Sequence, residues 1–448
     1  MINKNLIIAD LHLHSKYSRA VSQKMDLIEI ATWATRKGID LVGTADWTHP
    51  VWFREIQSQL KETEPGLFKL KKTPSEISSG LRFVLTVELS NIYSHNGQTR
   101  RIHTVVFSPN LSICEKVRQA LINRGVNLKS DGRPIMGLSI IELAELLWSV
   151  SEDIFILPAH IWTPWFSVYG SKSGYDSIKE CYGQYADRIT AIETGLSSDP
   201  IMNWSVPELA SRAIVSSSDA HSGPKLGREA TVFKIKNQKS KIKYLDLIGA
   251  MKQDPKANLE IAFTIEFFPE EGKYHFSGHR KCEVVFNPKQ VEKNKGLCPK
   301  CKKPLTIGVM DRVKTLAQVL ISEDELVIKK SHSHTSLVYP PKVNRPPFVS
   351  IVPLLEILAH LAGTSTHSKK VSEKYHQLIA KLGTEFEILL FKPIEEIEQA
   401  QEPLLAKAIK KMRAREVQLE PGYDGVFGKI FINVAAEETS QVQQESLF

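Results

Sequence analysis

The chain has 448 residues, of which 42% are hydrophobic and 24% are charged, and its formal net charge is +8 at pH 7. Its length is about three times that of a typical domain, so we expect two or three domains, each with an apolar core. No apolar run reaches the roughly 18 residues of a membrane-spanning helix, and the N-terminal segment lacks a leader-like pattern, so we expect a soluble, cytoplasmic protein. The mild excess of positive charge favours an anionic partner, of which nucleic acid is the commonest.

The first apolar run, residues 6–9, predicts a strand that leads into Asp10-Leu-His-Leu-His14. Because side chains alternate along a strand, Asp10, His12 and His14 would share one face. A carboxylate and two imidazoles at a strand end can bind a divalent metal. For this motif taken alone, incidental histidines on a surface strand are an equal alternative.

From there to about residue 230, strand-like and helical runs alternate. Apolar spacing predicts helices over 26–37, 113–123, 139–149 and 177–186, and strands over 39–44, 82–87, 102–107, 154–159, 190–193 and 213–217. Asp26 with Glu29, and Ser139 with Glu142, have the pattern of helix-capping pairs. The repeated alternation predicts an α/β fold with a parallel sheet, and this number of units favours a barrel.

Polar residues recur where these strands end, or inside a strand in one case. They are Asp46, His49, Glu88, His103, His160, Glu193, Asp219 and His221. Each alone would more often be structural, but barrel enzymes assemble their sites at the carboxyl ends of successive strands. So many histidines and carboxylates predict a site for two or three divalent metals, of a kind that zinc, manganese, iron or magnesium could fill.

The ordered set Asp10-Leu-His-Leu-His14, Asp46, Glu88, His103, His160 and Asp219-Ala-His221 resembles the polymerase and histidinol phosphatase (PHP) superfamily over about the first 230 residues. The resemblance implies a distorted seven-stranded (β/α) barrel and a cluster of up to three metals that hydrolyses phosphoesters. It implies one metal held by His12, His14, Glu88 and Asp219. Glu88 would bridge to a second metal with His103 and His221, and Asp46 and His160 would hold a third.

One position departs from that superfamily. Many members have Asp-His at the second motif, whereas this chain has Asp46-Trp47. Either Asp46 or His49 would then fill the third site. The resemblance also leaves Asp10 as a support for the ligands rather than as a ligand itself.

The loop after His160 is rich in aromatic residues and is punctuated by proline and glycine. Trp162, Trp165 and Phe166 either belong to the core or stack on a DNA base beside the metal ligands.

A second region, expected over 231–314, carries paired metal ligands. His279-x-x-Cys282 is followed, after fifteen residues, by Cys298-x-x-Cys301. Two such pairs predict one structural zinc in a small module, with His275 as a less usual substitute for His279 and free thiols as the alternative to a metal. The lysines and arginines around them would contact phosphates or form only a solvated face.

From about residue 315 the pattern becomes mainly helical, with helices predicted over 352–361, 373–390 and 403–416 and a last strand over 429–434. We expect this C-terminal region, 315–434, to contact DNA. Residues 435–448 are polar and predict a flexible tail.

The whole order of motifs resembles the endonuclease Q family. The resemblance rests on the metal ligands, on Tyr274 to Cys282 with Cys298-x-x-Cys301, on Arg345-Pro-Pro-Phe and on Pro421-Gly-Tyr-Asp-Gly425. It implies cleavage of double-stranded DNA on the 5′ side of a deaminated base (uracil, hypoxanthine or xanthine) or an abasic site. Two alternatives stay open: a small-molecule phosphatase of the PHP type, and a DNA-binding adaptor without catalysis.

The chain ends in Gln444-Glu-Ser-Leu-Phe448. This segment is similar to the short motif that binds the bacterial DNA sliding clamp, in which a glutamine and a terminal Leu-Phe pair enter pockets on the clamp. Gln444, Leu447 and Phe448 are therefore the predicted clamp contacts.

Overall fold

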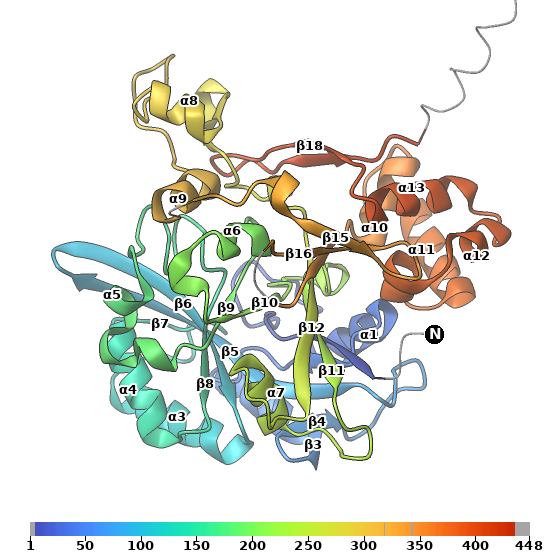
Figure 1. Cartoon of the computed structure of the whole chain (residues 1–448). Helices are drawn as coiled ribbons and strands as arrows, with labels where there is room; N and C mark the ends of the chain where they lie inside the picture. Colours follow the sequence, from blue (N-terminus) through green and yellow to red (C-terminus); the bar gives the residue numbers. More distant parts are fainter. Residues whose placement is uncertain (1–4, 318, 342–343, 435–448) are drawn as a thin grey trace, which may run out of the picture.

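The computed structural model describes residues 5–317, 319–341 and 344–434 (Figure 1). Its main feature is a mixed sheet with the strand order β15-β16-β17-β12-β11-β1-β2-β5-β4-β3; β6 and β7 also pair with β5, and β8 pairs with β6. These strands are β1 (Leu6–Asp10), β2 (Leu41–Gly43), β3 (Leu60–Glu64), β4 (Leu67–Leu70), β5 (Arg82–His95), β6 (Gln98–Ser108), β7 (Ile135–Met136), β8 (Phe155–Pro158), β11 (Ala230–Ile235), β12 (Leu259–Glu266), β15 (Val327–Lys330), β16 (Ser336–Tyr339) and β17 (Phe348–Ser350).

Three strand pairs lie outside that sheet. They are β9 (Ala191–Glu193) with β10 (Ala213–Val215), β13 (Ser277–His279) with β14 (Val284–Phe286), and β18 (Gln418–Glu420) with β19 (Lys429–Phe431).

The α-helices follow the expected alternation in the first half of the chain and cluster in the last quarter. They are α1 (Leu27–Lys37), α2 (Pro50–Gln59), α3 (Leu111–Asn123), α4 (Ile140–Val150), α5 (Ile178–Tyr182), α6 (Pro200–Trp204), α7 (Tyr244–Met251), α8 (Pro288–Lys293), α9 (Val309–Leu316), α10 (Leu354–Leu361), α11 (Lys369–Leu382), α12 (Ile394–Gln399) and α13 (Pro403–Arg413). Asp26 caps α1 through the amides of Ile28 and Glu29, and Ser139 and Glu142 form the predicted capping box of α4.

The expectation of a parallel sheet holds for only part of it. β1, β2 and β5 run parallel, whereas β5 pairs antiparallel with β6, and β6 antiparallel with β8. The reason lies in the turn between β5 and β6. Asn96 and Gly97 both have positive φ, 52° and 73°, as in the two-residue turns that join hairpin strands directly. An Asn-Gly pair favours such a turn, so no helix intervenes here.

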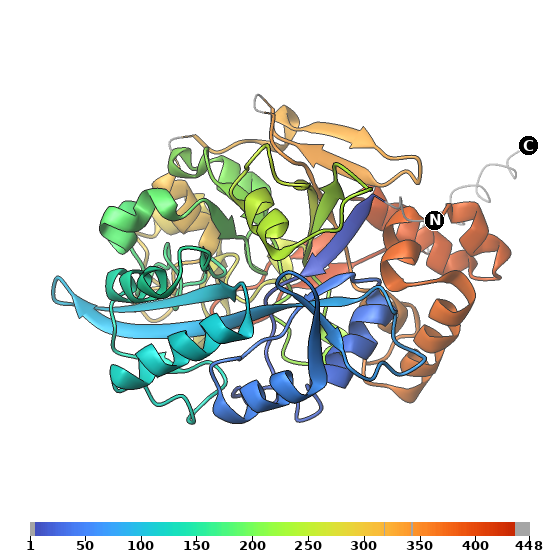
Figure 2. The ribbon, with the colours of Figure 1, turned by 90° about the horizontal axis from the view of Figure 1, so that it is seen from below.

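The sheet does not stop at the boundaries expected near residues 230 and 315. β11 and β12 continue it from β1, and β17 then pairs parallel with β12 before β16 and β15. The helices α10 to α13 gather on one side of the molecule in both views (Figures 1 and 2). The small unit that contains α8 stands out from the rest (Figure 1).

A buried ion pair joins the first helix to the C-terminal helices. The Lys37 ammonium at the end of α1 lies 2.8 Å from the Glu385 carboxylate, and the two side chains are 1% and 2% exposed. Glu385 also accepts hydrogen bonds from the Tyr375 hydroxyl and the Leu354 amide. Because a buried charge is costly unless it is paired and hydrogen-bonded, this cluster fixes the helical region against α1.

No helix within the described ranges is both long enough and apolar enough to span a membrane.

Candidate active site

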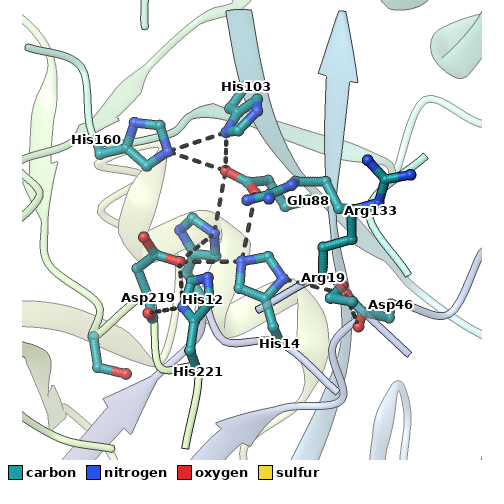
Figure 3. Close-up of polar contacts among 12 residues, drawn as sticks. His12, His14, Arg19, Asp46, Glu88, His103, Arg133, His160, Asp219 and His221 are labelled. Atoms are coloured by element: carbon teal, nitrogen blue, oxygen red, sulfur yellow. Dashed lines mark hydrogen bonds and ion pairs between the residues drawn. The ribbon is translucent and has the colours of Figure 1, made fainter. Parts of the chain in front are cut away.

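The predicted catalytic ligands come together in one region, with Glu88 inside β5, His103 inside β6 and the others after strand ends (Figure 3). Six of them form two groups, and within each group the ligand atoms lie within 4.8 Å of one another. The first group is His12, His14 and Asp219, and the second is Glu88, His103 and His160.

The first group is built on the segment after β1 and on the loop after β10. His14 Nε2 lies 3.0 Å from Asp219 Oδ1, and His12 Nε2 lies 3.8 Å from the same oxygen. Asp10, which precedes both histidines, accepts hydrogen bonds from the amides of Ser218 and Gly227. Asp10 therefore anchors the loop that carries Asp219 and does not join the group.

The second group centres on Glu88 in β5. Its Oε1 lies 2.8 Å from His103 Nδ1 and 3.1 Å from His160 Nε2. Glu88 also faces the first group, because Oε1 is 3.5 Å from His12 Nε2 and Oε2 is 3.4 Å from His14 Nε2. The carboxylate thus lies between the two sets of imidazoles, as a bridging ligand must.

This grouping differs from the assignment that the PHP resemblance implied. His160 lies with Glu88 and His103 rather than with Asp46. His221 lies instead beside the first group: its ring centroid is 4.7 Å from that of His14, and its Nδ1 is 3.7 Å from Asp219 Oδ1.

Two further carboxylates hold the histidines of the first motif. Glu193 Oε2 lies 2.9 Å from His12 Nδ1, and Asp46 Oδ1 lies 3.5 Å from His14 Nδ1. Each histidine therefore turns Nδ1 toward a carboxylate and Nε2 toward the centre of the site. Carboxylates in this position orient metal-binding imidazoles and make them better donors.

The structure also distinguishes between Asp46 and His49, the two candidates for the third metal site. Asp46 Oδ2 accepts hydrogen bonds from the Ser15 amide, the Ser15 hydroxyl and the Ser18 hydroxyl, and the residue is fully buried in the site. His49 instead caps α2, where Nδ1 accepts from the Trp52 amide, and its ring stacks on Tyr17. Of the two, Asp46 is the residue that faces the other ligands.

Three of the strand-end residues have a backbone conformation that non-glycine residues rarely adopt. Asp46, His160 and Asp219 have φ of 41°, 28° and 47°. Residues held in such conformations are found preferentially at functional sites, because the surrounding structure must compensate for their strain. Gly195 allows the close packing, since a Cβ there would lie 2.4 Å from the His160 Cβ.

The electrostatics of the site suit a cation. Burial raises the pKa of the Glu88 carboxyl, but His103, Arg133 and His12 outweigh burial and hold that pKa well below its usual range. Burial lowers the pKa of His103 to about 4, which leaves a neutral imidazole at neutral pH. For His14 burial acts in the same direction, but contacts with Asp219, Asp46 and Glu88 raise its pKa to about 9. The same carboxylates would attract a divalent metal in place of that proton.

An unsatisfied polar atom supports the same conclusion. His12 Nε2 is buried and makes no hydrogen bond within the described ranges, and it faces Glu88 Oε1 and Asp219 Oδ1 at 3.5 and 3.8 Å. Buried donors and acceptors are normally paired unless an ion or water completes them. Imidazole nitrogens and carboxylate oxygens are ligands for zinc, manganese and iron, so the residues present fit a metal cluster.

The aromatic loop divides between core and site. Trp162 is 1% exposed and donates its indole N–H to Asn203, so it lies in the core, away from any DNA base. Phe166 is half-buried, and its ring centroid lies 4.5 Å from that of His103. Trp165, also half-buried, contacts Tyr274 from the region of the paired cysteines. Phe166 therefore adjoins the candidate metal ligands, whereas Trp165 faces the region of the paired cysteines.

The predicted zinc ligands also meet. His279, Cys282, Cys298 and Cys301 form a third group within 4.8 Å, with His279 Nδ1 3.3 Å from Cys301 Sγ. Burial raises the pKa of the Cys298 thiol, but the amides of Cys301 and Lys300 outweigh it and lower that pKa to about 6, which favours the thiolate that binds metal. His275 lies outside the group and is buried, with its pKa lowered by burial to about 4.

Some residues around the site were missed by sequence reasoning. Arg133 Nη1 lies 2.9 Å from Glu88 Oε2, and Asp131, two residues earlier, contacts Arg19. They belong to Ser130-Asp-Gly-Arg-Pro134, which reads as an ordinary turn. Glu193 was noticed at a strand end, but its contact with His12 depends on a separation of 181 residues. Gln444, Leu447 and Phe448 lie outside the described residues.

The sequence is similar to one protein family and to two curated proteins. Residues 353–416 match the family described as the MJ0043 C-terminal domain. The chain is 31% identical over 277 residues to uncharacterized protein MJ0043 of Methanocaldococcus jannaschii, a match over 60% of this chain and only 31% of that protein. It is 26% identical over 441 residues to uncharacterized protein YqxK of Bacillus subtilis, and this match covers 95% of this chain and 99% of YqxK.

Two solved structures match over the whole length. The lesion-specific endonuclease PfuEndoQ from Pyrococcus furiosus has a TM-score of 0.79 and 30% identity, with 99% of this chain and 100% of that chain covered. An endonuclease Q in complex with a 27-mer duplex, with an abasic lesion at its active site, has a TM-score of 0.80 and 30% identity over 98% and 100% of the two chains. With that identity across both full lengths, this chain belongs to the endonuclease Q family.

Proposed function

We propose that this protein is a metal-dependent DNA repair endonuclease that cuts double-stranded DNA on the 5′ side of a deaminated base or an abasic site. The observation that carries the proposal is the pair of ligand groups joined by Glu88, in a chain that matches a DNA-bound endonuclease Q from end to end. The uracil, hypoxanthine and xanthine substrates come from the family resemblance alone.

The catalytic metals would be held by His12, His14 and Asp219 on one side and by His103 and His160 on the other, with Glu88 between them. Such metals, when bound, lower the pKa of water and stabilise charge on a phosphodiester. His221 lies beside the first group, and a third metal at Asp46 rests on the resemblance. Glu193 and Asp46 would fix the orientations of His12 and His14, so that these ligands are positioned before DNA arrives.

The barrel that the resemblance implied is part of this proposal. β9 and β10 would close the sheet between β8 and β1. In support, the Ile161 amide after β8 donates to the Glu193 carbonyl of β9, and Leu13 forms a bridge with Ala220. The candidate ligands would then lie around one mouth of a distorted seven-stranded barrel.

The third ligand group is proposed to hold one structural zinc. The four donors at His279, Cys282, Cys298 and Cys301 match the tetrahedral sites of small zinc modules. Its apolar cluster is small, with Val284, Val291, Cys298 and Leu305 as the buried members, so a metal would supply stability that this core lacks.

The function is tested with end-labelled duplexes that carry a single uracil, hypoxanthine or abasic site, incubated with metal or with a chelator. We expect one nick on the 5′ side of the lesion, lost with the chelator and lost in Asp219→Asn. Phosphate release only from monoesters would instead identify a phosphatase, and retarded but intact DNA would identify an adaptor without catalysis.

The partner expected at the tail is the DNA sliding clamp. Deletion of Leu447 and Phe448 should abolish binding of immobilised clamp while cleavage of short oligonucleotides continues at the rate of the full chain. Clamp binding that survives the deletion would rule out the motif.

A further inference from the structure

An arginine lies inside the candidate active site without being a metal ligand. Arg133 Nη1 contacts Glu88 Oε2 at 2.9 Å; the arginine side chain is 23% exposed and the glutamate fully buried. Figure 3 shows Arg133 and Arg19 beside the candidate ligands. A guanidinium next to a bridging carboxylate needs an explanation, because the metals of such a site already supply positive charge.

The segment that carries Arg133 is held firmly on both sides. Asp131 Oδ1 accepts from the Arg133 amide at 3.0 Å, and the Gly132 amide donates to the Tyr17 carbonyl at 2.9 Å. The Pro134 carbonyl accepts from the Ser90 amide in β5, two residues after Glu88. Gly132 has no room for a side chain, since a Cβ there would lie 2.3 Å from Asp46 Oδ2. The position of the guanidinium is therefore set before substrate binds.

The same aspartate holds a second arginine at the entrance. Asp131 is buried, and its Oδ2 lies 3.5 Å from Arg19 Nε, whose side chain is 79% exposed. Asp131 Oδ1 also accepts from the Arg19 amide at 3.4 Å. The Asp131 carboxylate thus positions both arginines: Arg133, which is mostly buried beside Glu88, and Arg19, which is exposed to solvent.

The donors of Arg133 are mostly free. A guanidinium has five N–H donors in one plane, and within the described ranges the side chain of Arg133 makes a single hydrogen bond, the one to Glu88. A metal held by Glu88 would share the charge of that carboxylate, and the remaining donors of the Arg133 guanidinium would stay available. Their planar fork fits a phosphate, which accepts two parallel N–H bonds.

We propose that Arg133 donates to a non-bridging oxygen of the scissile phosphate and that Arg19 contacts a neighbouring phosphate of the same strand. This inference rests on the proposed endonuclease function. In the reaction a water oxygen bonds to phosphorus and releases one proton to solvent, while the bond from phosphorus to the 3′ oxygen of the preceding nucleotide breaks and that oxygen takes up one proton. Arg133 stays protonated throughout and stabilises the extra negative charge of the transition state.

The experiment compares Arg133 with a matched arginine on β5, the strand that carries Glu88. Arg82, at the start of β5, pairs with Glu64 at 2.9 Å and is 22% exposed, but it lies away from the ligand groups. Arg133→Met, Arg133→Lys, Arg82→Met and Arg82→Lys are purified and loaded with metal. Metal content, thermal melting, the single-turnover cleavage rate, and DNA affinity in chelator are then measured for each.

We expect Arg133→Met to lower the single-turnover rate by roughly 10²- to 10³-fold, the loss typical of one transition-state donor, with metal content and melting as in the wild type. Arg133→Lys should recover part of the rate, since a point charge replaces the planar fork. Both Arg82 variants should cleave within about twofold of the wild type. Arg19→Ala should weaken DNA binding and reduce its salt dependence by about one phosphate contact.

Two results would overturn the inference without touching the proposed function. The first is an Arg133→Met rate within about threefold of the wild type. The second is a loss of rate that follows a loss of bound metal, which would make Arg133 only a support for Glu88. Wild-type protein that leaves lesion duplexes intact would defeat the proposed function itself, and the inference with it.

Discussion

The Glu193 carboxylate and the His12 imidazole meet 2.9 Å apart, although they lie on β9 and just after β1. Glu193 also accepts from the His160 amide at 2.8 Å, so one carboxylate positions a ligand of each group. A residue outside both ligand groups thereby positions a member of each.

Replacing this carboxylate tests that role. Glu193→Gln should weaken metal binding by about 10- to 100-fold, as for other groups that orient ligands, and should slow cleavage unless metal is in excess. Metal titration with a fluorescent competitor measures the change. Glu266→Gln is the control: Glu266 is equally buried, but it accepts from Ser216 and Thr194 rather than from a ligand, and its metal affinity should stay that of the wild type.

The same Glu266 predicts a pH dependence of stability. Burial raises the pKa of its carboxyl from 4.5 to about 8. The folded state therefore holds a proton that the unfolded chain releases above about pH 4.5, and the free energy of unfolding falls as pH rises toward 8. Glu266→Gln should remove this pH-dependent decrease in the free energy of unfolding. In urea unfolding with chelator, the free energy of unfolding of the variant relative to the wild type should increase by on the order of 1–3 kcal/mol between pH 5 and pH 8.5. A difference that stays constant with pH would contradict the raised pKa.

The two loop tryptophans should respond differently to truncation. Trp165→Ala should weaken cleavage of lesion DNA while metal content and melting temperature stay unchanged, because its half-buried ring lies outside the core, in the loop that follows the candidate ligand His160. Trp162→Ala should destabilise the fold by about 3–5 kcal/mol, since it empties a core position. Cleavage rates, metal analysis and chemical denaturation distinguish the two. An unaffected rate in Trp165→Ala would rule out a role in DNA contact.

The paired cysteines predict a metal that is independent of the catalytic cluster. Cys301→Ser should lose one equivalent of zinc and make the segment around α8 sensitive to protease, while the metals of the catalytic site remain. Cys114→Ala is the control, because Cys114 is buried in α3, outside the ligand groups. Equal zinc content in both variants would show that the thiols hold no metal.

Much of the site could be anticipated because its residues follow predictable strands. The alternation in Asp10-Leu-His-Leu-His14 does put the two histidines together, and Asp219 follows the strand predicted over 213–217. The partners of each ligand could not be read in this way. His160 lies with Glu88 and His103, and His221 lies beside His14 and Asp219, because contacts between distant strand ends are not encoded in local periodicity. Arg133 could not be predicted as a site residue because its turn has no hydrophobic periodicity. The hairpin of β5 and β6 could have been predicted, because Asn96-Gly97 is a typical two-residue hairpin turn.

The pairing of β12 with β17 bears on how the protein can be divided. A fragment that ends near residue 314 would leave β12 as an exposed edge strand and would remove Glu385, the partner of Lys37. Exposed edge strands recruit other chains. Expression of the N-terminal part alone should therefore yield aggregates rather than a smaller enzyme.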